Sequence, residues 1–150
     1  MTTTNDKNIA TALHLSTLTQ YIIPFGNYIF PIVIWSSKKE SEFIDNNGKQ
    51  VLNFQLSMFI YTILLCLIAI PILAYTFFYN IPFEAIINDN DVIIENFNFN
   101  HIGAFAIVGI TAVFILIALK VIEFVLTILA AVKASNGENY KYPLSIPFFK

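Results

Sequence analysis

Two charged side chains stand inside the longest apolar stretch of the sequence. Lys120 and Glu123 are spaced i, i+3 and Thr127 follows four residues later, so in a helix all three lie on one face. Counted from Lys133, Glu123 is about 15 Å and Lys120 about 20 Å along such a helix. A charged side chain at that depth in a bilayer is costly and usually functional.

We call Lys120, Glu123 and Thr127 the first polar stripe, and it has two interpretations. It could serve as a relay for protons or ions, or contact a substrate segment, as ionisable groups inside membranes often do. It could instead be an internal ion pair or polar contact that locks one helix to another. We favour the second interpretation, because a relay normally needs further titratable groups nearby.

A second polar stripe has the same i, i+3, i+7 spacing and consists of Gln50, Asn53 and Ser57. Counted from Lys49, Ser57 is about 12 Å along a helix, a depth similar to that of Glu123. We therefore expect the two stripes to face each other and to form interhelical hydrogen bonds. Lining of a hydrophilic vestibule is the alternative. The six residues together are the candidate in-membrane polar site.

Other kinds of site find no support in the residue pattern. The sequence has no Gly-rich phosphate loop, no nucleophile elbow, no His-Glu-x-x-His motif and no carboxylate pair with a general acid/base arrangement. His14 and His101 lie far apart, and neither has a carboxylate or cysteine at metal-ligand spacing. The single Cys66 sits in an apolar run and cannot form an internal disulfide. We predict no catalytic residue, no cofactor and no metal site, and so no enzyme.

The composition explains where these stripes must lie. Of the 150 residues, 57% are hydrophobic and 12% charged, whereas a soluble domain is roughly a quarter charged. A soluble fold of this length could not bury so much apolar surface, because a small globule leaves much of its surface in contact with water. The basic residues are all lysine, and no basic patch exists to bind nucleic acid. The lipid bilayer is therefore the predicted solvent.

The apolar pattern predicts an all-α integral membrane protein, a compact bundle of about four helices in a single domain, 1–150. Open strands would leave unpaired backbone groups in hydrocarbon. The expected elements are a short broken pair in 9–35 and two long spans, with helices at about 9–22, 24–36, 50–79 and 102–134, a polar loop at 36–49, a connector at 80–100 and a C-terminal strap at 137–150.

Lysine placement predicts the topology. The loop 36–49 and the tail after residue 132 carry lysines, whereas the connector 80–100 carries only acidic charges. By the positive-inside rule the loop and the C-terminus are cytoplasmic and the connector is outside, in a bacterial inner membrane. The broken segment 9–35 is either one kinked span or a hairpin that returns to the cytoplasmic side. We favour the hairpin, because it keeps Lys7 inside.

Short motifs are spread over nearly the whole chain. They are His14-Leu15-Ser16, Ile23-Pro24-Phe25-Gly26-Asn27, Pro31-Ile32-Val33-Ile34-Trp35, Lys38-Lys39, Phe43-Ile44-Asp45, Gly48-Lys49, Leu52-Asn53-Phe54-Gln55, Ala134-Ser135-Asn136-Gly137-Glu138 and Tyr140-Lys141-Tyr142-Pro143-Leu144. Together they resemble a family of small bacterial membrane proteins of unknown function. That family is grouped with the twenty-kilodalton channel subunit of the chloroplast inner-envelope (Tic) protein import machinery.

The resemblance implies a bundle of about four helices with both termini on the cytoplasmic side, which supports the hairpin. The connector 80–100 looks longer than is usual in that family, and Lys120 and Glu123 are not part of its pattern. We expect a non-enzymatic structural, assembly or translocation-related component, whose partners are the bilayer and other membrane proteins or further copies of itself. The alternative is a small channel or transporter that uses the two polar stripes.

Overall fold

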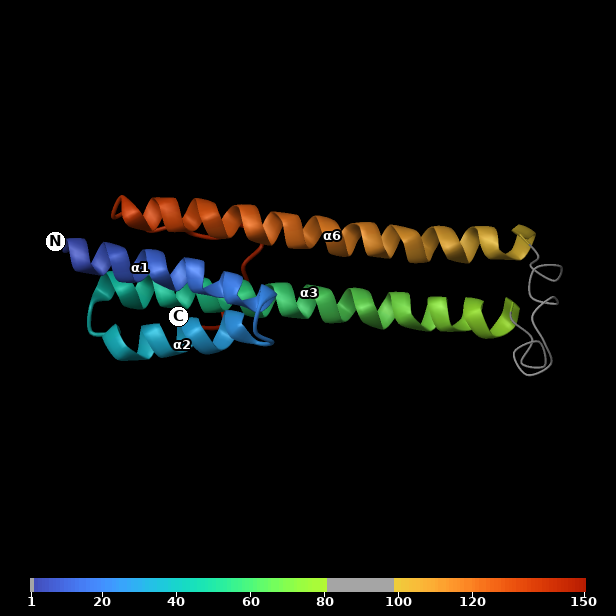
Figure 1. The fold of residues 1–150 in the computed structure, drawn as a ribbon, viewed down its shortest axis with the longest axis horizontal. Coiled ribbons are helices and arrows are strands. Elements are labelled where there is room, and N and C mark those ends of the chain that lie inside the picture. Colours follow the sequence, from blue (N-terminus) through green and yellow to red (C-terminus); the bar gives the residue numbers. More distant parts are fainter. Residues whose placement is uncertain (1, 81–98) are drawn as a thin grey trace. The chain divides into compact units, whose positions relative to one another are not determined.

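The computed structural model describes residues 2–80 and 99–150, and within these ranges the chain is helical with no strand. The elements are α1 (Thr4–Ser16), the 3-10 helix η1 (Thr17–Tyr21), α2 (Gly26–Lys38), α3 (Glu42–Asn80) and α6 (Phe99–Ser135), as Figure 1 shows. The predicted fold class, a short broken pair of helices ahead of two long ones, is confirmed. The predicted connector at 80–100 falls almost entirely outside the described residues.

Helix α1 begins with a capping box. The Thr3 hydroxyl accepts from the backbone N–H of Asp6, and the Asp6 carboxylate accepts from the backbone N–H of Thr3, both at 3.1 Å. Two otherwise unpaired amides are thereby satisfied. The helix starts at Thr4 rather than near residue 9, because the capping signal lies in polar residues upstream of the apolar pattern.

Residues 22–25 separate the first two helices. Phe25 adopts a left-handed backbone conformation (φ 61°), which a helix cannot continue through. Gly26 then packs against Thr19, where a Cβ would lie 2.5 Å from the Thr19 hydroxyl oxygen. Because α1 and α2 contact each other side by side, the segment is a helical hairpin and not one kinked helix (Figure 1).

The predicted polar loop at 36–49 is wrong for most of its length. Helix α2 continues to Lys38 and α3 already begins at Glu42, so only three residues connect them. The Asp45 and Lys49 side chains form an i, i+4 ion pair at 2.6 Å on the first turns of α3. The sequence 46–48, Asn-Asn-Gly, resembles a turn but is helical here. Gly48 leaves the room that the Trp35 indole occupies.

The chain divides into two compact units. Unit 1 comprises Met1–Ile60 and Leu119–Lys150, and unit 2 comprises Tyr61–Ala118. The interior of unit 1 is built from apolar side chains of α1, α3, α6 and the tail, including Ala10, Leu13, Ile44, Val51, Leu52, Phe54, Ala130, Ala131, Ala134 and Tyr142. Alanines at helix contacts let the backbones approach closely, as is common in membrane bundles.

Two helices are long and apolar enough to cross a membrane, Glu42–Tyr75 and Ile107–Ser135. In the most apolar window of each, only 17% of the residues are buried. The core helix of a soluble protein would be mostly covered by protein. Long apolar helices that protein leaves so uncovered are typical of transmembrane helices in contact with lipid, and we interpret both in this way.

Candidate functional site

The carboxylate of Glu123 lies in the interior of unit 1 and is 1% exposed. One of its oxygens accepts a hydrogen bond from the Lys120 ammonium at 2.8 Å, and the other accepts from the Gln20 amide at 2.9 Å. The Gln20 carbonyl oxygen also lies 3.4 Å from the Lys120 ammonium. The lysine side chain remains 48% exposed. The structure thus brings Lys120 and Glu123 together and adds Gln20 from η1.

Thr127 lies one helical turn beyond Glu123 on α6 and is buried. Its hydroxyl is close to the phenol of Tyr142 but makes no hydrogen bond of ordinary geometry within the described residues. The first stripe therefore begins with a paired carboxylate and ends in a buried hydroxyl. That hydroxyl is one of the few buried polar groups of unit 1 without a partner there.

The second stripe holds the C-terminal strap. The Asn53 side-chain oxygen accepts from the backbone N–H groups of Phe148 and Phe149 at 3.0 and 2.8 Å, and its amide donates to the Phe149 carbonyl at 2.9 Å. The Ser57 hydroxyl accepts from the N–H of Ile146 at 2.7 Å and donates to the Asn53 carbonyl. The Asn53 and Ser57 side chains thus supply the strap, which has no regular secondary structure, with the backbone hydrogen bonds that a neighbouring strand would give to a β-strand.

The two stripes are not joined by hydrogen bonds in the part of unit 1 that the structure describes. Glu123 turns toward Gln20 of η1, whereas Asn53 and Ser57 turn toward the tail. Gln50, the remaining member, is half-buried. Whether the six residues act as one functional site stays a prediction.

A third polar cluster centres on the fully buried His14 of α1. Its Nδ1 lies 2.8 Å from the Tyr142 hydroxyl and its Nε2 lies 2.9 Å from the Asn47 side-chain oxygen. The Asn47 amide nitrogen donates elsewhere, to the Phe43 carbonyl and the Asn139 side chain. The Asn47 oxygen therefore accepts, so Nε2 carries the imidazole proton and Nδ1 accepts from the tyrosine.

The surroundings keep this cluster uncharged. Burial lowers the pKa of His14 to about 4, although the hydrogen bond that His14 donates to the Asn47 oxygen acts in the opposite direction. Burial raises the pKa of Tyr142 well above its usual range. The Tyr142 ring also stacks on Phe54 with ring centroids 4.1 Å apart. A neutral imidazole and a neutral phenol therefore fasten the tail to α1 and α3.

A fourth polar contact joins α2 to α3. The Asn27 amide donates to the Gln55 side-chain oxygen at 2.7 Å, and the Tyr28 hydroxyl donates to the Gln55 backbone carbonyl at 3.2 Å. The Gln55 amide nitrogen is buried, and no partner for it lies within the described residues. Each of the four contacts thus connects two segments that are distant in the sequence.

Sequence reasoning missed several members of this network. Gln20, Asn47 and Tyr142 were not predicted as site residues, since nothing in their local spacing indicates a partner on another element. A usable signal did exist. Asn53, Gln55 and Tyr142 belong to the short motifs Asn-Phe-Gln and Tyr-x-Tyr-Pro that carry the family resemblance.

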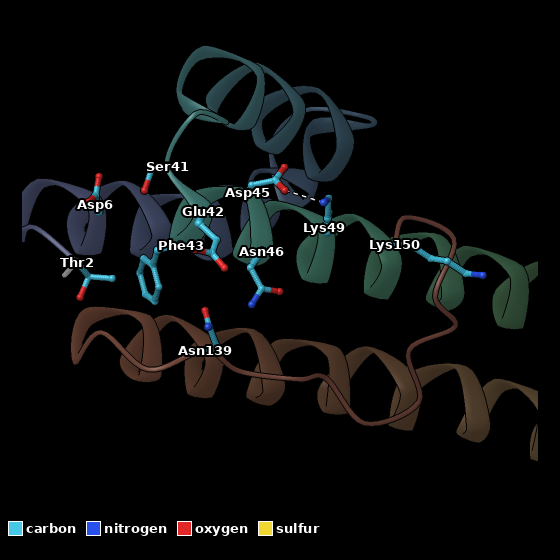
Figure 2. Close-up of a pocket in the computed structure, with 10 residues that line it drawn as sticks. All are labelled: Thr2, Asp6, Ser41, Glu42, Phe43, Asp45, Asn46, Lys49, Asn139 and Lys150. Atoms are coloured by element: carbon cyan, nitrogen blue, oxygen red, sulfur yellow. Dashed lines mark ion pairs between the residues drawn. The ribbon is translucent and has the colours of Figure 1, made fainter.

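The charged end of unit 1 has an open hollow of about 550 Å³, shown in Figure 2. Three carboxylates line it, but Asp45 is paired with Lys49 and Asp6 belongs to the capping box. Among the described residues, no group of three His, Cys, Asp or Glu side chains is placed to hold a metal ion.

These features define a class: a small helical membrane protein whose buried polar side chains bind one another and its own tail. Comparison with known sequences identifies the family within this class. The chain belongs to the magnetosome magnetite crystal formation protein family, whose pattern matches residues 5–149. No curated protein and no solved structure matches the chain. It is thus a membrane protein of a bacterial, magnetosome-associated family.

Proposed function

We propose that the protein is a non-enzymatic, multi-pass structural or assembly component of the membrane in which its family supports magnetite crystal formation. The observation that carries this proposal is the internal use of the costly polar groups. Both oxygens of Glu123 and all polar atoms of Asn53 accept or donate hydrogen bonds within unit 1. Groups used in this way stabilise a packed bundle.

The same observation argues against a polar passage as the first choice. A transport path needs polar atoms that face an ion or a substrate, with groups of matching character along its length. Here Asn53 and Ser57 are occupied by the backbone of the strap. Removing the strap would be required before these side chains could line a path.

Paired substitutions test the proposal. Glu123→Gln and Lys120→Met each remove one charge, and Gln50→Ala serves as a control at a half-buried stripe position. Under the proposal both charge variants weaken folding or complex formation in mild detergent, while ion and proton flux of reconstituted vesicles stays at the level of protein-free vesicles. Flux by the native protein that either variant abolishes, with folding intact, would contradict it.

A small channel or transporter is the second candidate, and one observation favours it. Glu123, the unpaired hydroxyl of Thr127, Tyr142 and His14 follow one another in the interior of unit 1. Hydroxyls and ionisable groups in sequence are the elements of a proton relay. Thr127→Val separates the candidates, since it removes the hydroxyl at nearly constant volume. A relay would lose flux, whereas a packing role predicts unchanged flux and unchanged stability.

Location and partners form the remaining part of the proposal. We place the protein in the bacterial cytoplasmic membrane or a compartment derived from it, with the lysine-bearing end cytoplasmic. Tags at residue 1 and after Lys150 should both be inaccessible from outside intact spheroplasts. Other membrane proteins or further copies of the chain are the expected partners, and co-purification in mild detergent identifies them. Recovery of translocation components would support the role that the Tic resemblance implies.

A further inference from the structure

The turn between α1 and α2 presents the most exposed large apolar side chains of unit 1. Ile22 is 85% exposed and Phe25 is 67% exposed, and Tyr21 and Ile23 beside them are exposed as well. We name residues 21–25 the hairpin tip. Such a group of large apolar side chains is unfavourable in contact with water and favours an apolar environment.

Several backbone N–H groups at the hairpin tip have hydrogen-bond partners within the hairpin itself. The N–H groups of Ile22 and Ile23 donate to the Thr19 carbonyl, and the N–H of Gly26 donates to the Ile23 carbonyl. Pro24 has no N–H to satisfy. An irregular turn can enter hydrocarbon only when its polar backbone groups are paired. The tip meets this condition for these donors.

Side-chain contacts fix the level of the tip within unit 1. Gln20, next to the tip, binds Glu123, which is about 15 Å along α6 from Lys133. Asn27, on its other side, binds Gln55, which is about 9 Å along α3 from Lys49. Both distances fall short of the roughly 30 Å of a hydrocarbon core. The tip therefore reaches a middle depth and not the opposite surface.

The charged residues of the hairpin lie at its base and are absent from its tip, as expected if the tip enters the hydrocarbon core of a bilayer. Asp6 and Lys7 lie in the first turn of α1, and Lys38 ends α2, whereas residues 8–37 carry no Asp, Glu, Lys or Arg. The charged base and the apolar tip are opposite ends of the same two helices. Helix α2, with 13 residues, rises only about 20 Å and is too short to span.

The strap shows an independent adaptation at a similar level. Its N–H groups at Ile146, Phe148 and Phe149 are satisfied by Ser57 and Asn53, and its two prolines lack an N–H. Ser57 lies about 12 Å along α3 from Lys49. A second irregular segment of unit 1 is therefore also paired in the manner that a water-poor environment demands.

Lipid is the occupant that fits the tip. Around the same level, α6 exposes Val121 and Val125, and α2 exposes Ile29. The apolar surface is therefore a belt over several helices. A local patch ringed by polar side chains would instead suit a protein partner.

We propose that the hairpin formed by α1, η1 and α2 is re-entrant: it enters the bilayer from the lysine-bearing side, and its tip packs against lipid acyl chains near mid-depth before the chain returns. Only α3 and α6 then cross the membrane. The inference needs the membrane location but not the assembly role proposed above, so either can fail without the other.

Depth-dependent fluorescence quenching tests the inference. Trp35 is the single tryptophan, so Ile22→Trp in a Trp35→Phe background gives one probe at the tip. The protein is reconstituted in phosphatidylcholine vesicles whose lipids carry bromine either near the headgroup or near the end of the acyl chain. The native chain, with Trp35 three residues before Lys38, is the matched shallow control. Phe25→Trp in the same background replaces Ile22→Trp if that variant does not fold, as judged by circular dichroism.

The tip probe should lose more fluorescence with deep bromine than with shallow bromine and should resist aqueous iodide. The control should show the reverse order of lipid quenching. Quenching of the tip by iodide would mean that the tip lies at a membrane surface and would overturn the inference. Weak quenching by both lipids and by iodide would mean that protein covers the tip, which would overturn it equally.

Discussion

The imidazole of His14 and the phenol of Tyr142 are hydrogen-bonded at 2.8 Å although 128 residues separate them in the chain. Both groups are buried, and together with Asn47 they fasten the C-terminal segment to the first helix. The contact explains how a tail with two prolines and no helix keeps a defined place. Its strength depends on the neutral state of both rings.

Removing the Tyr142 hydroxyl should destabilise unit 1. Tyr142→Phe keeps the stacking on Phe54 but leaves the buried Nδ1 of His14 without a donor, which we expect to lower the free energy of unfolding by about 1–3 kcal/mol. Thermal unfolding in detergent, followed by circular dichroism, measures this loss. Tyr140→Phe is the control, because Tyr140 is only half-buried. Equal melting temperatures for the two variants would contradict the assigned hydrogen bond.

Acid should destabilise the fold through His14. The pKa in the folded state is about 4, below the ordinary value of 6.5, so between these pH values the unfolded chain binds more protons. Stability therefore falls as the pH drops from about 6.5 to about 4, by at most about 3 kcal/mol from this group, and is unaffected above that window.

The measurement for His14 is a comparison of variants across pH. Unfolding of the native chain and of His14→Gln is followed at pH 7.5 and pH 5, and the difference between the two chains cancels the titration of the carboxylates. The native chain should lose more stability than the variant on acidification. A pH dependence identical in both chains would show that His14 does not titrate in this window.

Substitutions of Lys120 and of Glu123 should lower the free energy of unfolding by different amounts. Lys120→Met leaves the buried carboxylate with Gln20 alone, whereas Glu123→Gln leaves a lysine that is half exposed and can reach a polar environment. We expect Lys120→Met to lower the free energy of unfolding by about 2 kcal/mol or more, and Glu123→Gln by less. Chemical unfolding in mixed micelles gives both values. The reverse order would mean that the ammonium, and not the carboxylate, is the group that depends on its partner.

How much of this arrangement the sequence revealed depends on the range of each interaction. The pair Lys120 and Glu123 was predictable, because helical spacing alone brings i and i+3 together. Gln20 was not, because its contact with Glu123 depends on how η1 packs against α6. The start of α3 at Glu42 was hidden for a related reason. The Asn-Asn-Gly sequence favours a turn locally, but Asn47 is held in the helix by its contact with His14.

The strap, residues 137–150, should become more mobile when the Asn53 side chain that binds its backbone is removed. Asn53→Ala deletes three hydrogen bonds to the backbone of Phe148 and Phe149, so their amides become free to exchange with solvent. Hydrogen exchange followed by mass spectrometry on C-terminal peptides should show faster uptake at residues 146–149. Gln50→Ala is the matched control on the same helix. Slow exchange in both variants would indicate that the aromatic contacts of the strap, such as Phe149 with Trp35, hold it without Asn53.

Replacing either of two glycines in the long helices with alanine should change the stability of the fold, but in opposite directions. A Cβ at Gly48 would overlap the Trp35 indole, whereas a Cβ at Gly103 would meet nothing within 4 Å. Gly48→Ala forces the ring to shift and should cost about 1–3 kcal/mol of stability, with a change in tryptophan emission. Gly103→Ala should stabilise by up to about 1 kcal/mol, because alanine favours helix and no contact is disturbed. A neutral Gly48→Ala with unchanged emission would show that the indole does not occupy the space beside α3, and the contact between α2 and α3 would need another basis.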